Sequence, residues 1–392
     1  MKTSLIFGFF HLRCQNHLTL TSKSIYFKGI LIISVAKHIF VCENMLAGPS
    51  KYKFLIIRNR VECIWTSLMV FLAMAKTIQT NRNNIQEKIM NEPLISIIIP
   101  IYNGEKYIDK CLSNVVAQTY KNLEILCVIN GTTDSSEEKV REWMQKDERI
   151  RILVTDVADL GHASNLGIEN TTGPYLSFVD VDDWVEPEYI EKLYGGIKKG
   201  YKICKGNCTM YDGVKNLPAY QGRSSGEISI RGASFLLPCR TISVYDRSLF
   251  EKLRYLEFSY YEDLSLWPIL IATAGCVYYI NDIIYNYNQT NETSIMTVRN
   301  EKHLVLDKVF AHIFSNLTPD LDREVNLLIS ALFIQSFWTS NYQYVPKDEV
   351  GQAYLRRVKQ VVDNRLVGYY YIVENLPVPK EMKERMIRFY RN

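Results

Sequence analysis

Three carboxylates fall within four residues of the stretch FVDVDDW, residues 178–184. Asp180, Asp182 and Asp183 come directly after the apolar run YLSFV, which predicts a buried strand. Like charges this close repel one another, so we expect a cationic partner at the end of that strand. Carboxylate oxygens suit Mg²⁺ or Mn²⁺, ions that commonly bridge to phosphates. The alternative is that Asp182 or Asp183 simply caps the helix that follows.

The elements around this motif alternate between strands and helices. Continuous apolar runs predict strands buried on both faces, and the amphipathic or charged stretches between them predict helices. Such alternation is typical of right-handed βαβ units around a parallel sheet, which is an α/β fold. The predicted strands are 94–100, 123–129, 150–154 and 175–180, and the predicted helices lie in 104–119, 135–147, 163–170 and 186–197.

Parallel sheets bind ligands beyond the carboxyl ends of their strands. The polar residues at those ends should therefore lie along one edge of the sheet. They are Pro100 to Asn103, Asn130 to Asp134, Asp156, and Asp180 to Asp183.

Two long segments resemble the family 2 glycosyltransferases. They are PLISIIIPIYNGEKYIDKCLSNVVAQTYKNLEILCVINGTTDSS and TTGPYLSFVDVDDWVEPEYIEKLY; the resemblance covers 90–200 closely and 235–296 more loosely. It implies a GT-A (Rossmann-like) fold with a mixed, mostly parallel sheet flanked by helices, in which a nucleotide-sugar half precedes an acceptor half. It also implies sugar transfer with inversion. By resemblance Asp182 binds the divalent metal, Mg²⁺ or Mn²⁺, and Asp180 lies against the ribose as a second candidate ligand.

The resemblance also assigns a catalytic base. The segment SYYEDLSLW (259–267) matches the family's Glu-Asp motif, which places the base at Asp263 with Glu262 beside it. Without the resemblance, this pair would be interpreted as acidic residues in the first turn of an apolar helix. Glu262 is expected to raise the pKa of Asp263 through like-charge repulsion.

The nucleotide side departs from the family pattern. Pro100, Tyr102 and Asn130 are the candidate nucleotide contacts, but Asn130 replaces an Asp that contacts the nucleobase. An Asn oxygen still accepts a hydrogen bond from a uracil N–H. Ser164 replaces an arginine, and a Tyr-Arg pair is represented by Tyr287-Asn288. These changes indicate an altered donor preference, weaker donor binding or an inactive relative.

The first 89 residues differ from the rest of the chain. They carry a net charge of +9, whereas residues 90–392 carry −5. The stretch 63–75 is too short to span a membrane as a helix, and an interfacial or pairing segment is one interpretation of it. We interpret 1–89 as an N-terminal extension, or as sequence upstream of a true start at Met90. The acidic body argues against nucleic-acid binding, and scattered cysteines without a CxxC pair favour the cytoplasm.

The remaining boundaries follow from composition. We expect a catalytic domain over 90–298, with a donor half at 90–200 and an acceptor half at 201–298. A helical C-terminal region follows at 299–392. Its last segment, KEMKERMIRFYRN (380–392), is either a packed terminal helix or a basic surface for peripheral membrane association.

The expected function is transfer of a sugar from a nucleotide-diphosphate sugar, in particular a UDP-sugar, to a glycan or lipid-linked acceptor in bacterial surface-polysaccharide synthesis. The cytoplasm or the inner face of the membrane is the expected location. A catalytically inactive binding protein is the alternative. A nucleotidyltransferase is disfavoured, because the loop IYNGEKY (101–107) lacks the Gly-rich basic pattern such enzymes need.

Overall fold

A computed structural model describes 92–219, 222–291, 294, 300–317, 322–376 and 378–391, together with the backbone of five N-terminal strands. The chain divides into two compact units, Met1–Asn91 and Glu92–Asn392. Among the described residues, no helix is both long and apolar enough to cross a membrane. The segment 63–75, interpreted above as interfacial or pairing, lies outside the described residues.

The first unit contains an antiparallel sheet with the strand order β1-β2-β3-β4-β5. The bounds of these strands are Phe7–Arg13, Thr19–Phe27, Ile30–Val35, His38–Glu43 and Phe54–Ile57.

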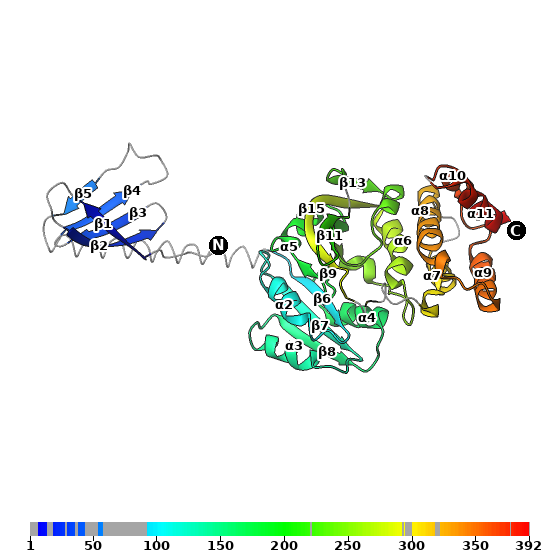
Figure 1. The fold of residues 1–392 in the computed structure, drawn as a ribbon, viewed down its shortest axis with the longest axis horizontal. Coiled ribbons are helices and arrows are strands. Elements are labelled where there is room, and N and C mark those ends of the chain that lie inside the picture. The colour runs from blue at the N-terminus through cyan, green and yellow to red at the C-terminus, as the bar shows by residue number, and fades with distance from the viewer. Residues whose placement is uncertain are drawn as a thin grey trace. The chain divides into compact units, whose positions relative to one another are not determined.

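The second unit is built on a mixed sheet with the order β10-β15-β11-β14-β9-β6-β7-β8 (Figure 1). β12 pairs with β11, and β13 pairs with β15. The block β9-β6-β7-β8 is parallel, as predicted, whereas β14 runs antiparallel to both β9 and β11. The strands are β6 Ile95–Ile101, β7 Leu123–Asn130, β8 Ile150–Thr155, β9 Tyr175–Phe178, β10 Trp184–Val185, β11 Ile203–Tyr211, β12 Asn216–Pro218, β13 Gly226–Ser229, β14 Ser243–Asp246 and β15 Cys276–Asn288.

Helices cover both faces of this sheet, because its central strands are apolar on both sides. Along β6, Ile97 and Ile99 face the core under α2 and α5, while Ile98 faces the core under α4 and α6. The helices are α2 Ile108–Val116, α3 Ser136–Met144, α4 Leu160–Asn170, α5 Tyr189–Ile197, α6 Glu262–Ala274, α7 Leu306–Ser315, α8 Arg323–Phe333, α9 Glu349–Val362, α10 Tyr369–Glu374 and α11 Lys380–Arg391.

The predicted α/β fold is confirmed, with one local difference. The predicted helix 163–170 begins earlier, at Leu160, because the Asp159 carboxylate caps it by accepting a hydrogen bond from the His162 N–H at 2.7 Å. The long strand β15 is stabilised by β11 and β13, which pair with it along its length.

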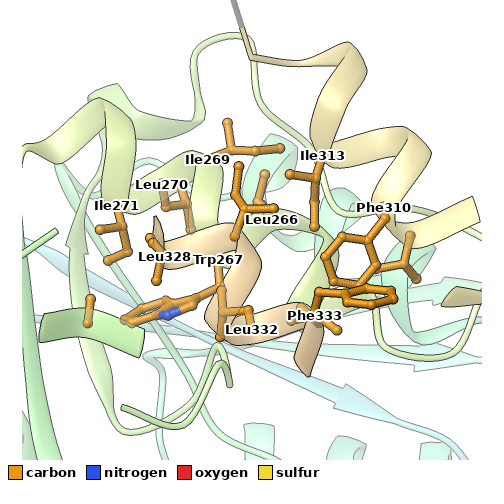
Figure 2. Close-up of a cluster of buried hydrophobic side chains, with 14 of the residues drawn as sticks. Leu266, Trp267, Ile269, Leu270, Ile271, Phe310, Ile313, Leu328, Leu332 and Phe333 are labelled. Atoms are coloured by element: carbon orange, nitrogen blue, oxygen red, sulfur yellow. The ribbon is translucent and has the colours of Figure 1, made fainter. Parts of the chain in front are cut away.

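The C-terminal helices pack on α6 and share its core. Leu266 and Leu270 of α6, Phe310 of α7 and Leu332 of α8 belong to one buried apolar cluster (Figure 2). The last helix, α11, buries Met386, and the Tyr369 hydroxyl donates to the Met386 carbonyl at 3.1 Å. The terminal segment is therefore a packed helix, and most of its charged side chains remain at the surface.

This shared core predicts that one cavity on α8 destabilises the whole second unit. Leu332→Ala removes a side chain that is 1% exposed, and should lower the free energy of unfolding by about 2–5 kcal/mol. Val350→Ala on α9, at a half-exposed position, is the matched control and should change stability by less than about 0.5 kcal/mol. Urea denaturation followed by circular dichroism measures both; equal midpoints for the two variants would contradict the shared core.

Candidate active site

The carboxylate motif forms a turn at the end of β9. The Asp183 N–H donates to the Asp180 carbonyl at 3.1 Å, so the chain reverses there. The Asp183 side chain is buried, and accepts hydrogen bonds from the Tyr285 hydroxyl at 2.6 Å and the Asn288 N–H at 2.8 Å. Burial raises the pKa of Asp183 well above its usual range. Asp183 therefore anchors the turn to β15.

Helix capping does not explain the motif. The next helix, α5, begins at Tyr189 with Glu188 as its N-cap residue. Asp182 and Asp183 lie several residues before that cap, so neither is the N-cap of α5.

Asp182 occupies the tip of the turn. One of its carboxylate oxygens accepts from the Asn291 amide at 2.8 Å, and its carbonyl accepts from the Asn288 amide at 3.1 Å. Burial, and then the negative charge of Asp180, raise the pKa of Asp182. A carboxylate held in this way would be favoured in its charged form by an added cation.

A buried cation that the sequence analysis did not identify, Arg240, lies at the end of this strand. Its side chain is almost fully buried and forms ion pairs with three carboxylates: Asp180, Glu262 at 3.0 Å and Asp263 at 3.3 Å. Burial by itself lowers the pKa of Arg240, but these negative charges outweigh burial and raise it. Arg240 thus joins the two carboxylate motifs into one cluster.

Glu262 and Asp263 begin α6, directly after Tyr261, whose backbone is left-handed at φ 61°. Burial and the charge of Asp263 raise the pKa of Glu262 to about 8. Burial also raises the pKa of Asp263, while Arg240 opposes that shift. The pKa of Asp263 is therefore raised, as expected, but the main cause is burial rather than repulsion by Glu262. The Asp263 side chain is the more accessible of the two, at 22% exposed against 8% for Glu262.

The loop that carries Arg240 is held by a second buried cation, Lys205 of β11. Its ammonium donates to the carbonyls of Cys239 at 2.9 Å and Thr241 at 3.2 Å, and to the Ser243 hydroxyl at 3.2 Å. It also lies 5.0 Å from the centre of the Trp267 ring, on α6. Lys205 therefore fixes the backbone on both sides of Arg240.

The predicted nucleotide contacts lie at the ends of β6 and β7. Pro100 is buried in β6, and Tyr102 beyond it is 55% exposed. Asn130 is 2% exposed, and its side-chain oxygen has no hydrogen-bond partner among the described residues. Gly131 follows with φ +64°, where a Cβ would lie 2.6 Å from the Ala158 Cβ. The chain turns here in a way that a larger residue would hinder.

Two of the departures from the family pattern, Ser164 and Asn288, have local structural roles. Ser164 is buried in α4 and donates to the Leu160 carbonyl at 2.8 Å. The neighbouring Asn165 donates to Glu257 at 2.9 Å, which ties α4 to the segment before α6. Asn288 holds both Asp182 and Asp183, as described above. The sequence reasoning noted the missing arginines but not this anchoring.

A pocket of about 190 Å³ opens beside Asp182. Tyr107, Trp184 and Tyr211 line it, and the Lys110 ammonium lies 3.0 Å from the centre of the Trp184 ring. Among the described residues, no three His, Cys, Asp or Glu side chains converge as a complete ligand set for a metal ion. The carboxylate oxygens of Asp180 and Asp182 are the hard donors that Mg²⁺ or Mn²⁺ would accept from the protein, with water and phosphate completing the shell.

Removing Arg240 should strongly destabilise the second unit. Arg240→Met leaves Asp180, Glu262 and Asp263 without their shared counter-charge, and loss of one partner from a buried ion pair costs about 3–5 kcal/mol. Arg247→Met is a control at another arginine bound mainly to carbonyls, and it should not change how stability depends on pH. Arg240→Met should recover stability at acidic pH, where the carboxylates are neutral. Urea midpoints at pH 5 and pH 8 measure this; pH-independent destabilisation would contradict it.

Glu262 should make stability depend on pH. Its pKa is raised in the folded state, so the native protein holds a proton that the unfolded chain releases above its ordinary pKa of 4.5. This contribution is fully present below pH 4.5 and is lost as pH rises through about 8. Glu262→Gln removes the ionisation. The stability of the wild type relative to this variant should therefore decline between pH 5 and pH 9 in urea titrations, and a constant difference would count against the assignment.

Comparisons with known proteins agree with this geometry. The family model for glycosyl transferase family 2 matches residues 96–254. The chain is 30% identical to the glycosyltransferase GlyG of Streptococcus pneumoniae over 58% of this chain and 80% of GlyG. It is 29% identical to GlyA of the same organism over 76% of this chain, but spans only 47% of GlyA. The crystal structure of Staphylococcus aureus TarS 1–349 with UDP superposes with a TM-score of 0.60 at 18% identity, covering 76% of this chain and 89% of that one. The fold is therefore GT-A-like, and the chain belongs to the family 2 glycosyltransferases.

Proposed function

We propose that this protein is an inverting, metal-dependent glycosyltransferase. It transfers a sugar from a UDP-sugar to a glycan or lipid-linked acceptor in the synthesis of a bacterial surface polysaccharide. The observation that carries the proposal is the convergence of two distant motifs on one guanidinium. Arg240 contacts both Asp180 at the end of β9 and Asp263 at the start of α6. A donor-binding motif and a candidate base therefore share one site.

The donor side is supported by the strand ends. The unpartnered oxygen of Asn130 is a buried acceptor suited to a uracil N–H. The exposed ring of Tyr102, two residues beyond Pro100, offers an apolar face for the base. The S. aureus TarS structures include complexes with UDP and with UDP-GlcNAc, which favours a uridine donor.

Asp182 and Asp180 would hold Mg²⁺ or Mn²⁺ on the diphosphate. The metal, when bound, would offset negative charge that develops on the leaving nucleotide. The aromatic pocket beside Asp182 provides apolar walls, Trp184 and Tyr211, near the place where the diphosphate and sugar would lie.

Asp263 would act as the general base. Its carboxylate takes the proton of the acceptor hydroxyl, the oxygen attacks the anomeric carbon, and the bond to the nucleotide diphosphate breaks. A single displacement of this kind inverts the anomeric centre. Arg240 orients the Asp263 carboxylate, and Glu262 is the deeper member of the pair. We place this chemistry in the cytoplasm, with peripheral association at the inner face of the membrane if the acceptor is lipid-linked.

The metal role is tested at Asp182. Asp182→Ala should abolish Mn²⁺-dependent binding of UDP in calorimetry while the urea midpoint stays near that of the wild type. Glu188→Ala, an exposed acid six residues further along, is the control and should bind UDP normally. Unchanged Mn²⁺-dependent binding by Asp182→Ala would refute the metal assignment.

The base role is tested at Asp263. Asp263→Asn keeps the shape of the side chain but removes its basicity, so UDP binding should persist while turnover falls by about 10²-fold or more. Glu262→Gln should cost much less. Turnover is measured as UDP released from the UDP-sugar that stabilises the wild type most in a thermal-shift screen with Mn²⁺. Normal turnover by Asp263→Asn would remove it from the mechanism, and a screen in which no UDP-sugar binds would favour an inactive relative.

A further inference from the structure

The helices α7 and α9 lie in the C-terminal helical region (Figure 1), and their residues line a hollow with a charged lining. Its volume is about 590 Å³, within the range of ligand pockets. None of its lining residues belongs to the candidate active site. Three of them are cationic and one is acidic: Lys308, Arg357, Arg365 and Asp307.

Arg357 is oriented by a buried carboxylate. Its Nε donates to an oxygen of Asp307 at 2.7 Å, and the Asp307 side chain is only 8% exposed. The second Asp307 oxygen has no hydrogen-bond partner among the described residues. Burying a carboxylate for a single bond to a half-exposed arginine adds little stability. The contact does fix the Arg357 guanidinium through its Nε. The two terminal nitrogens of Arg357 remain available to donate hydrogen bonds to a ligand.

Arg365 is held on the same hollow by a different contact. Its guanidinium carbon lies 5.0 Å from the centre of the Phe314 ring, which also lines the hollow. Neither Arg365 nor Lys308 has a carboxylate within 4.0 Å among the described residues. Two arginines held by separate contacts thus share one hollow with a lysine, and the single acid already pairs with Arg357.

We propose that this hollow binds the phosphate group of a phosphate ester. Planar guanidiniums recognise phosphate oxygens through paired N–H donors, and fixing them in advance reduces the entropy lost on binding. Gln360 adds an amide to the lining, and Phe314 provides an apolar wall for the group that carries the phosphate. Such an ester could be a phosphorylated glycan or a phospholipid headgroup. The site goes beyond the proposed transfer reaction, because its residues take no part in donor binding or in catalysis.

The test is a pair of charge-matched double variants of the full chain. Lys308→Gln with Arg365→Gln removes two cations from the hollow and leaves the Asp307–Arg357 pair intact. Lys347→Gln with Arg356→Gln removes two exposed cations outside it, and Arg356 is the direct neighbour of Arg357. Pyrophosphate binding is measured by calorimetry at low salt without divalent metal, which separates it from the metal-dependent donor site. The hollow variant should bind at least about tenfold more weakly than the wild type, and the control within about twofold.

The source of the phosphate is distinguished by a second arm. The wild type and the hollow variant are mixed with phosphatidylglycerol vesicles. If the wild type associates, the hollow variant does not, and pyrophosphate displaces the vesicles, the site binds a lipid headgroup. If the wild type binds pyrophosphate but not vesicles, the site binds a soluble phosphate ester. Equal losses in the two double variants, or no pyrophosphate binding by the wild type, would overturn the proposal. Mn²⁺-dependent UDP binding is recorded for every variant. Its absence from the wild type would refute the proposed function while leaving the result for the hollow intact.

Discussion

The active-site architecture depends on one buried guanidinium. Arg240 is 3% exposed and pairs with three carboxylates that come from the end of β9 and the start of α6. Charges of one sign would otherwise force these two elements apart, and burying the acids without a counter-charge would cost several kcal/mol. Arg240 therefore sets how closely the end of β9 and the start of α6 approach each other. Other contacts in the second unit hold the Arg240 guanidinium in this position.

Two sets of contacts hold the elements of this cluster. Lys205 binds the carbonyls around Arg240, and the same ammonium lies over Trp267 of α6, one turn beyond Asp263. The C-terminal helices also pack on α6, where Trp267 lies beside Leu328 and Leu332 of α8 (Figure 2). A helix that presents two acids at its first turn must be held rigidly if those acids are to keep their geometry. The C-terminal helical region supplies this support through apolar packing, because it shares a core with α6.

The sequence predicts the parallel block of the sheet well, and the structure shows why it predicts the cluster poorly. The strands β6, β7 and β9 are almost wholly buried and mostly apolar, so their pattern is visible without tertiary information. The carboxylates are visible for a similar reason, because they interrupt or follow apolar runs. Arg240, in contrast, lies in LLPCRTISV with no local signal, and its partners are 22 to 60 residues away. Asp183 and Asn288 likewise gain their anchoring role only when β15 lies beside the turn. Long-range pairing of polar groups leaves no periodicity in the sequence, which is why resemblance identified the motifs but not the residue that joins them.

The departures from the family pattern affect how the negative charge of a bound nucleotide would be balanced. Arginines are absent at positions 164 and 288. The Asn288 backbone N–H instead donates to the Asp183 carboxylate, and its side-chain amide donates to the Asp182 carbonyl. Arg240 already pairs with three acids, and Lys110, a cation that lines the pocket beside Asp182, lies over the Trp184 ring. A nucleotide diphosphate would bring further negative charge to a cluster that is acidic before it binds. Part of the counter-charge would then have to come from a cation that binds with the ligand. The absence of arginines at these two positions therefore favours the proposed use of a divalent metal, which would supply that counter-charge.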